Sequence, residues 1–210
     1  MVREGYPFFL AFLIIAVILA AVAFVFPSVY LWIGVIVSVL IALFMAYFFR
    51  DPERAISSET DIIVSPADGR VTRIEENDEG KFISIFLSPV DVHINRSPIA
   101  GKVTKVSYIT GRKKPATSDQ ASIVNERNAL IIEGEKITVV CTQIAGILAR
   151  RIVCWKKEGD SLAIGERFGL IKFSSRTDLQ MPPNVDVLVK VDDKVKGGET
   201  IIARIIEKTD

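Results

Sequence analysis

The amino-acid sequence predicts two parts, an N-terminal transmembrane helical hairpin and a mainly β domain of the α+β class. Three observations carry this prediction. Residues 7–49 contain no Asp, Glu, Lys, Arg or His. Residues 51–210 hold nearly all of the chain's 26 basic and 25 acidic residues and are close to charge-balanced. Within that second part, short runs of alternating apolar and polar residues are separated by Gly and Pro, which is typical of β-strands joined by turns.

The uncharged run is too long for one membrane crossing. As a single helix, residues 7–49 would measure about 65 Å, whereas the apolar core of a bilayer is about 30 Å thick. Pro27 lies near the middle, and proline breaks a helix because it lacks the backbone N–H donor. We therefore expect two spans at about 7–26 and 29–49, which together form an anchoring unit over residues 1–50.

Basic residues flank both spans on the same side. Arg3 precedes the first span, and Arg50 and Arg54 follow the second. The positive-inside rule then predicts a protein of the cell (cytoplasmic) membrane, with the domain 51–210 facing the cytoplasm. Arg3, the apolar run and Ala21–Ala23 also fit a cleaved secretory signal, but cleavage there would leave a second apolar segment in the membrane. A buried soluble hairpin is the other alternative, although the rest of the chain is not apolar enough to surround two helices without a polar face.

The second part is predicted to be built from strands around Gly- and Pro-containing turns. Residues 112–122 are polar and are expected to form a loop. The C-terminal residues 185–205 resemble the hairpin pattern of lipoyl- and biotinyl-type domains, so we expect barrel-sandwich or lipoyl-like hairpin elements. The expected strands are Lys81–Ser88, Val103–Thr110, two strands within Ala129–Gln143 around an EGEK turn, Arg167–Phe173, Val185–Val191 and Thr200–Ile206.

A short pattern occurs twice in this part. Ser65–Val71 and Ser97–Val103 share the form S-P-x-x-G-[KR]-V, a turn leading into a strand. Two copies of one supersecondary unit could pack as a pseudo-symmetric β-sandwich or barrel. Short turn motifs also repeat by chance, so the pattern is weak evidence when it stands alone.

Composition excludes several classes of function. The balanced charge gives no support for a nucleic-acid partner, which would favour a basic excess. Cys141 and Cys154 are too few for a disulfide scaffold or a zinc site made only of cysteines, and the single His93 excludes a site needing two imidazoles from one chain. No metal site and no nucleotide-binding glycine motif is expected.

Two groups of residues could carry chemistry. Asp91 and His93 would share one face of an extended strand, and Asp68 or Asp91 could orient the imidazole toward a serine. No G-x-S-x-G turn is present to hold such a serine. Ser174 and Ser175 follow the apolar run GLIKF, which from composition alone reads as a strand end followed by a turn.

Seven segments follow one another in a recognisable order: REGYPF (3–8), FFRDPER (48–54), SPADGRV (65–71), LSPVDVHINRSPIAGKV (87–103), NERNAL (125–130), QIAGILARRIVCW (143–155) and GERFGLIKFSSRTDLQMP (165–182). Together they resemble the short-form phosphatidylserine decarboxylases, a pyruvoyl-dependent family. The resemblance covers nearly the whole chain and includes the two apolar spans.

The resemblance implies that the chain cuts its own backbone between Ser174 and Ser175 and that Ser175 becomes an N-terminal pyruvoyl group. The family usually has Gly-Ser at this bond, so Ser174 is a departure. Cleavage would give a large fragment, 1–174, and a small fragment, 175–210, of about 19 and about 4 kDa out of 23.2 kDa. The two fragments are expected to associate as a heterodimer, and a higher oligomer stays open.

The implied reaction is decarboxylation of a serine phospholipid to the ethanolamine phospholipid, through a Schiff base with the pyruvoyl carbonyl. Phosphatidylserine is the expected substrate. Archaetidylserine is an alternative because its headgroup chemistry is identical. A non-catalytic, membrane-tethered lipoyl-like β module is the alternative of a different class, although no lysine in an M-K-M-like setting is present.

The resemblance also assigns roles to individual residues. Asp68 matches the acid of the family's P-A-D-G motif, and His93 matches the first His of its D-x-H motif. His93 is expected to act as the base in maturation, as the proton donor in turnover, or as both, with Asp68 orienting it or assisting at Ser175. The place of a second His in longer members is taken by Arg96. Arg96, Lys172 and Arg176 are candidates for binding the lipid phosphate, and Asn125 and Arg127 of the NERN run are expected to be structural.

Overall fold

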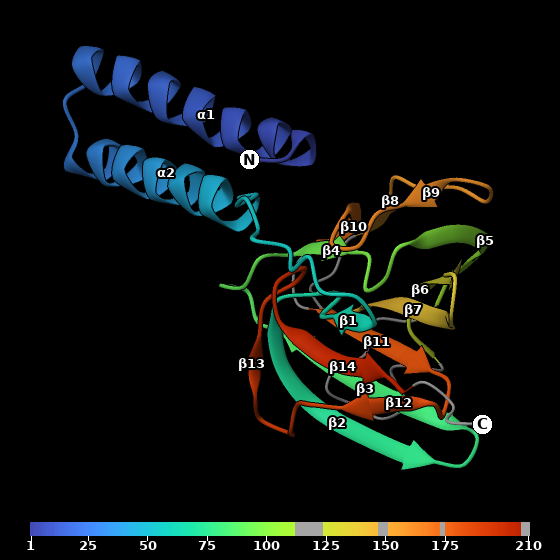
Figure 1. Cartoon of the computed structure of the whole chain (residues 1–210). Helices are drawn as coiled ribbons and strands as arrows, with labels where there is room; N and C mark the ends of the chain where they lie inside the picture. Colours follow the sequence, from blue (N-terminus) through green and yellow to red (C-terminus); the bar gives the residue numbers. More distant parts are fainter. Residues whose placement is uncertain (112–123, 147–150, 173–174, 207–210) are drawn as a thin grey trace. The chain divides into compact units, whose positions relative to one another are not determined.

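The computed structural model describes residues 1–111, 124–146, 151–172 and 175–206. The chain divides into two compact units, Met1–Pro52 and Glu53–Asp210. The predicted combination of two apolar helices and a mainly β domain is confirmed (Figure 1).

The first unit is a helical hairpin. A short 3-10 helix, η1 (Arg3–Gly5), leads into α1 (Tyr6–Val25), and α2 (Val29–Phe48) follows after Pro27, which lies at the predicted break. Gly5 lets the two ends meet, because a Cβ at this position would lie 2.5 Å from the Phe49 Cβ, and the Val2 N–H donates to the Phe49 carbonyl at 2.9 Å.

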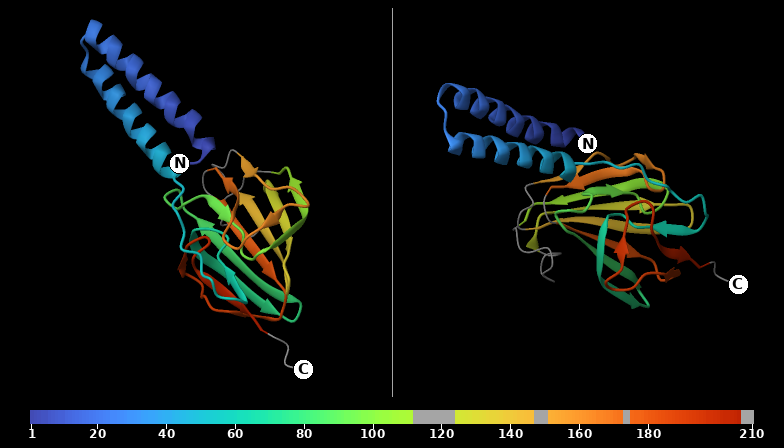
Figure 2. Two further views of the ribbon diagram at one scale, coloured as in Figure 1. Left: turned by 45° about the horizontal axis from the view of Figure 1, so that its top comes forward. Right: turned by 90° about the vertical axis from the view of Figure 1, so that its left-hand side faces the viewer.

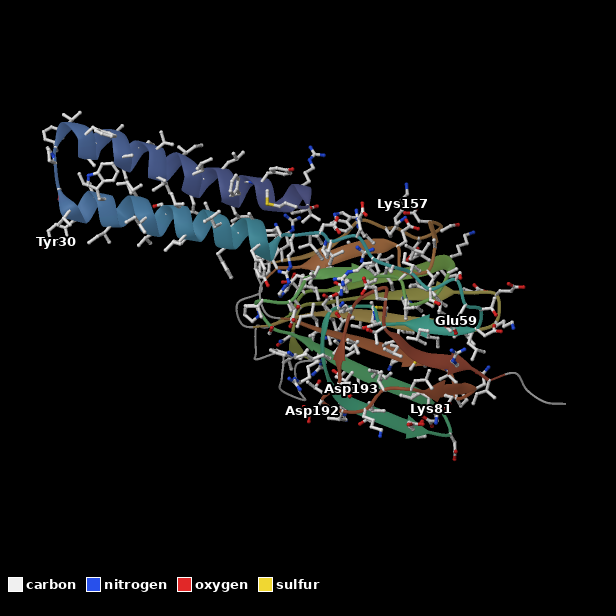
Figure 3. All side chains as sticks on the ribbon, turned by 60° about the vertical axis from the view of Figure 1, so that its left-hand side comes forward. Tyr30, Glu59, Lys81, Lys157, Asp192 and Asp193 are labelled. Carbon is white, nitrogen blue, oxygen red and sulfur yellow. The ribbon has the colours of Figure 1, made fainter. Side chains whose placement is uncertain are left out.

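Both long helices have the length and composition needed to cross a membrane. Most of their apolar side chains face outward, as the sticks around Tyr30 in Figure 3 show. Such a surface has no favourable partner in water, whereas lipid chains can cover it. The hairpin therefore fits a membrane anchor better than the core of a soluble protein.

The second unit is built from three antiparallel sheets. The large sheet has the strand order β13-β2-β3-β11-β7-β6-β5-β9, and two smaller sheets have the orders β1-β14-β12 and β4-β10-β8. The large sheet is strongly curled, and Figure 2 shows the smaller sheets beside it. The strands are β1 (Ile62–Val64), β2 (Gly69–Asn77), β3 (Gly80–Leu87), β4 (Ile94–Arg96), β5 (Gly101–Ile109), β6 (Arg127–Glu133), β7 (Thr138–Ala145), β8 (Ile152–Cys154), β9 (Ser161–Leu162), β10 (Arg167–Ile171), β11 (Ser175–Met181), β12 (Val185–Val187), β13 (Lys194–Val195) and β14 (Ile201–Ile205).

One face of the large sheet forms the hydrophobic core. Alternate residues of its central strands point to this face, because successive side chains of a strand lie on opposite sides. Ile83 and Ile85 of β3, Leu179 of β11 and Cys141 of β7 are fully buried there. The smaller sheets contribute further core residues, including Ile63, Phe168 and Ile202.

The repeated sequence pattern is a real structural repeat. The Ser65 hydroxyl donates to the Ala67 carbonyl, and the Ser97 hydroxyl donates to the Ile99 carbonyl, at 2.7 Å in both cases. The two turns also bond each other reciprocally. The Arg96 N–H donates to the Pro66 carbonyl at 2.9 Å, and the Val64 N–H donates to the Pro98 carbonyl at 3.0 Å.

The repeat continues beyond these turns into the later strands. The Val71 N–H bonds the Asp193 carbonyl, as the Val103 N–H bonds the Asp160 carbonyl. Asp193 and Asp160 also accept, through their carboxylates, the backbone N–H groups of Lys190 and Lys157, so that both tight turns have the same construction. Lys157 and Asp193 are labelled in Figure 3. The domain is thus a pseudo-symmetric pair of units, each contributed by two distant stretches of chain.

The expected strands are found as β3, β5, β6, β7, β10, β12 and β14, with ends that differ by up to a few residues. The long strand β11 was not expected, and β2 was expected only at its start, where the Ser65–Val71 turn leads into a strand. Both strands carry polar and charged residues at positions that do not alternate cleanly. The predicted loop 112–122 lies outside the described residues.

Candidate active site

Ser175 is the first residue of β11, a strand in the interior of the large sheet. It pairs with Leu87 of β3 on one side and with Ala145 of β7 on the other. The side chain is completely buried, and its Oγ has no hydrogen-bond partner among the described residues. A buried hydroxyl without a partner is costly, so its position between two apolar neighbours points to a chemical role. Ser174 lies outside the described residues.

His93 stands directly before β4 and is 2 % exposed. Its Nδ1 lies 3.0 Å from the Asp91 carbonyl oxygen. Because a carbonyl can only accept, this contact requires the proton on Nδ1, which in the neutral ring leaves the lone pair on Nε2. The Asp91 carboxylate instead accepts hydrogen bonds from the Ser88 backbone N–H and hydroxyl, at 2.8 and 2.6 Å. Asp91 thus orients the imidazole through its backbone.

Two contacts place β4 beside the chain on either side of Ser175. The His93 carbonyl accepts the Ile171 N–H at 3.2 Å, four residues before Ser175. The Asn95 side-chain amide donates to the Thr177 hydroxyl at 2.9 Å, two residues after Ser175. His93 and Asn95 share one face of the extended chain, as Ser175 and Thr177 do. The structure therefore brings the His93 segment to the start of β11.

Asp68 is engaged by other groups. Both of its carboxylate oxygens accept from Arg54 Nη2 at 2.8 Å, and Oδ1 also accepts from the Gly197 N–H at 2.8 Å. Burial raises the pKa of this carboxyl above its usual value, and Gly197 and Arg54 offset part of that effect. None of the described hydrogen bonds of Asp68 reaches His93 or Ser175. In the described part of the chain, no direct contact with His93 or Ser175 supports the predicted role of Asp68.

The three phosphate candidates occupy different environments. Arg96 is buried and lies on the face of β4 opposite to Asn95, where Nη1 donates to the Gly165 carbonyl at 3.0 Å. It lines an open surface pocket of about 460 Å³ together with Ile56 and Arg167. Lys172 is half-buried, and its backbone N–H donates to the Arg151 carbonyl.

Arg176 points to the other face of β11 from Ser175, because it is the next residue along the strand. Its Nη2 and Nε each lie 2.9 Å from a carboxylate oxygen of Asp178, and the Ser84 hydroxyl donates to the same carboxylate at 2.7 Å. Arg176 and Asp178 are both almost fully buried. The Arg176 guanidinium therefore pairs with a buried carboxylate inside the domain.

Four polar residues beside Ser175 were not found by sequence reasoning. Asn95, Thr177, Gln143 and Asn128 are all essentially inaccessible to solvent and are joined by hydrogen bonds. The sequence does contain one sign of these residues, namely a polar side chain at a core-facing position of an otherwise apolar strand, such as Gln143 in VVCTQIA.

Asn125 of the NERN run is buried as well, and its amide donates to the Ala145 carbonyl at 2.8 Å. It therefore holds the strand end opposite Ser175, while Arg127 begins β6 and is half-buried.

Thiol and metal chemistry have little support at this site. Burial raises the pKa of both thiols, Cys141 and Cys154, which favours the unreactive protonated form. In the described ranges no group of three or more His, Cys, Asp or Glu side chains is arranged to hold a metal ion. The site instead offers a buried hydroxyl, an imidazole with a defined tautomer and a set of amides.

Comparison with known proteins identifies the family. The family model described as "Phosphatidylserine decarboxylase" matches residues 41–203. A protein of Syntrophus aciditrophicus (strain SB) named "Phosphatidylserine decarboxylase proenzyme" is 45% identical over 208 residues, which cover 94% of this chain and 94% of the relative. A protein of the same name from Magnetococcus marinus is 41% identical over 213 residues, covering 97% of this chain and 94% of the relative. The chain, with its buried serine at the start of a central strand, belongs to the phosphatidylserine decarboxylase family.

Proposed function

We propose that this chain is the proenzyme of a pyruvoyl-dependent decarboxylase that converts a serine phospholipid into the ethanolamine phospholipid and CO₂. The observation that carries the proposal is the buried Ser175 hydroxyl, which has no hydrogen-bond partner among the described residues and lies where the His93 segment meets β11. Membership of the family and the proenzyme names of two relatives support it.

Maturation begins with the Ser175 hydroxyl as nucleophile. Oγ attacks the carbonyl carbon of Ser174, and His93 accepts the hydroxyl proton on Nε2. The C–N bond then breaks, so that the amide becomes an ester and the Ser175 nitrogen becomes a free amine. Loss of the Ser175 α-proton expels the Ser174 carboxylate. Addition of water and release of ammonia leave a ketone at residue 175, and atoms balance with one water consumed and one ammonia released.

The residues around Ser175 fit such a group. The Ser175 side chain is completely buried, and the flanking Leu87 and Ala145 have no polar side-chain atoms that would compete for the new carbonyl. A pyruvoyl group at residue 175 would supply an electrophilic carbonyl for the substrate amine and an electron sink for the decarboxylation. His93 holds a proton at Nδ1 and can deliver one from Nε2 to the substrate carbon. Asp68 and Arg54 fix the P-A-D-G turn, and Arg96 and Lys172 remain the phosphate candidates.

The two fragments are expected to stay together as a heterodimer after cleavage. Three of the four described strands of the small fragment pair with the large fragment. β11 lies between β3 and β7, β13 pairs with β2, and β14 pairs with β1. Cutting the 174–175 bond removes one covalent link and leaves this whole network of backbone hydrogen bonds in place.

The substrate is a lipid, which explains why a membrane anchor is useful. The described helices could hold the domain at the bilayer surface where serine headgroups are presented. We propose that the domain faces the cytoplasm, as the flanking Arg3, Arg50 and Arg54 predict. In intact cells an impermeant maleimide should then label a Ser28→Cys variant and not the wild type. Labelling only after lysis would reverse the proposed orientation.

The proposed function is tested by the mass and chemistry of the purified chain. Denaturing gels and intact-mass spectrometry should show two fragments divided between Ser174 and Ser175, and hydroxylamine should modify the small one. Ser175→Ala should remain a single chain of 23.2 kDa and release no CO₂ from phosphatidylserine. A fully active preparation consisting of the uncut chain would overturn the proposal. Parallel assays with archaetidylserine distinguish the two lipid backbones.

A further inference from the structure

Three of the four buried polar residues form a single row across the large sheet. Thr177 of β11 is directly opposite Gln143 of β7, which is directly opposite Asn128 of β6. Asn95 approaches from β4 of a smaller sheet and bridges to this row. The hydrogen bonds run from Asn128 Nδ2 to Gln143 Oε1 at 3.0 Å, from Gln143 Nε2 to Asn95 Oδ1 at 2.8 Å, and from Asn95 Nδ2 to Thr177 Oγ1 at 2.9 Å.

The row lies between Ser175 and the hydrophobic core. Along β11 the side chains on this face are Ser175, Thr177 and Leu179 in turn. Leu179 is opposite Ile83 and Cys141, deep in the core. The row is therefore the first polar layer below the serine, and Thr177 carries the hydroxyl that follows Ser175 on the same face.

Such a row would be costly if it served packing alone. Burying an amide without full hydrogen bonding is unfavourable, and apolar residues would fill the same space without that risk. The fold also makes room for it. A Cβ on Gly169 of β10 would lie 2.9 Å from Gln143 Nε2, and Gly169 is the residue paired with Asn95. The close approach of β10 to the amide thus depends on a glycine.

The hydrogen bonds have a fixed direction. Gln143 donates to the Asn95 oxygen, and the Asn95 nitrogen faces both Thr177 and the Pro66 carbonyl, which lies at 3.5 Å and can only accept, so the Thr177 oxygen accepts. Reversing any one amide would place two donors or two acceptors against each other. Gln143 therefore sets the orientation of Asn95, and Asn95 ties β4 to β11.

We propose that the Asn95–Thr177 hydrogen bond, oriented by Gln143, sets the position of His93 relative to Ser175 for self-cleavage. His93 is two residues before Asn95 on the same face, and Ser175 is two residues before Thr177 on the same face. Fixing Asn95 against Thr177 therefore also fixes His93 relative to Ser175. Asn95, Thr177 and Gln143 are positioning residues, and the inference rests on the proposed cleavage at Ser175.

The first test removes the acceptor while keeping the shape. Thr177→Val replaces the hydroxyl by a methyl group, and Thr177→Ser keeps the hydroxyl. In cell-free synthesis with membranes, the uncut chain should convert about tenfold or more slowly in Thr177→Val, and at close to the wild-type rate in Thr177→Ser. Thr142→Val is the matched control, because Thr142 lies on the opposite face of β7, and it should convert like the wild type.

The second test gives a readout that a merely structural role would not change. In Gln143→Glu the ionised carboxylate can only accept, so it would turn the Asn95 amide and take its donor away from Thr177 and from the Pro66 carbonyl. Only the reversed bond, in which the Thr177 hydroxyl donates to Asn95, would then join the two residues. The protonated carboxyl can donate to Asn95 and accept from Asn128, as the amide does. Self-cleavage of Gln143→Glu should therefore be slow at pH 8 and recover at pH 5, relative to the wild type at each pH. Gln180→Glu, at an exposed position of β11, should show no such recovery.

The outcomes separate this inference from the proposed function. If the wild type is cut at 174–175 and Thr177→Val is cut equally fast, the positioning role is wrong and the proposed function stands. If Gln143→Glu shows no recovery at low pH, the directional argument is wrong, even where the variants are unstable. A wild-type chain that is never cut overturns the proposed function itself.

Discussion

Arg54 binds Asp68 through both carboxylate oxygens at 2.8 Å, although the two residues belong to different sequence motifs. The Arg54 side chain is 6% exposed and that of Asp68 is 15% exposed. This pair ties the segment that follows α2 to the turn that begins β2. It also occupies the carboxylate that the family resemblance assigns to the active site.

The Asp68 carboxyl should make stability depend on pH. Its pKa is raised above 3.8 in the folded state, chiefly by burial. A raised pKa means that the folded chain binds the proton more tightly, so this stabilisation is full below about pH 3.8 and is lost as pH rises through the folded pKa. In an uncut Ser175→Ala background, the thermal midpoint relative to Asp68→Asn should fall as pH rises from about 4. If the difference in thermal midpoint between the two chains stays constant across this pH range, the Asp68 carboxyl keeps its ordinary pKa.

His93 should control self-cleavage. His93→Gln keeps an amide donor near the Asp91 carbonyl but removes the ring nitrogen that takes the Ser175 proton. General-base catalysis is worth about 100- to 10,000-fold, so the half-time of cleavage should lengthen by at least about 100-fold. The band pattern of newly made chain over time measures this. Ser88→Ala, which alters a neighbour of Asp91, is the control and should be cut within a few-fold of the wild-type rate. Equal cleavage in His93→Gln would assign the base to another residue.

Ser174→Gly should accelerate self-cleavage. Glycine adopts strained backbone conformations that serine resists, and an attack on the residue's own carbonyl requires the backbone to bend toward the hydroxyl. We expect a shorter half-time in a pulse-chase experiment with the same fragment masses. Slower cleavage would show that Ser174 contributes a group of its own to the reaction.

Arg176 should act on stability rather than on substrate binding. Its guanidinium pairs with the buried Asp178, so Arg176→Met removes a positive partner of that carboxylate, at a cost of about 3–5 kcal/mol. The thermal midpoint should fall, and Arg176→Met combined with Asp178→Leu should recover part of it. The KM for the lipid should remain that of the wild type. A several-fold rise in KM without loss of stability would instead support phosphate binding.

The sequence was most informative where physical constraints act locally. The absence of charge over residues 7–49 defines the hairpin, and alternation over Lys81–Ser88 defines β3. By contrast, β11 reads as polar although it is buried, because groups on other strands bond its side chains: the Ser84 hydroxyl donates to Asp178, and the Asn95 amide donates to Thr177. Those partners come from the folded arrangement, which local periodicity does not report.

The candidate active site likewise combines residues that the sequence predicts with contacts that arise only in the folded chain. Ser175 and His93 could be selected from motifs, and the structure brings their segments together. The engagement of Asp68 by Arg54 and the amide row through Gln143 depend on strand order and register. Neither is encoded in the spacing of residues along the chain.

The reciprocal bonds between the two proline turns have a consequence for any attempt to divide the domain. The Pro66 turn is closed by Arg96, and the Pro98 turn is closed by Val64. Each copy expressed separately would lose the N–H donor that closes its turn. Cleavage at 174–175, in contrast, keeps both closing bonds, since Val64, Pro66, Arg96 and Pro98 all lie in the large fragment.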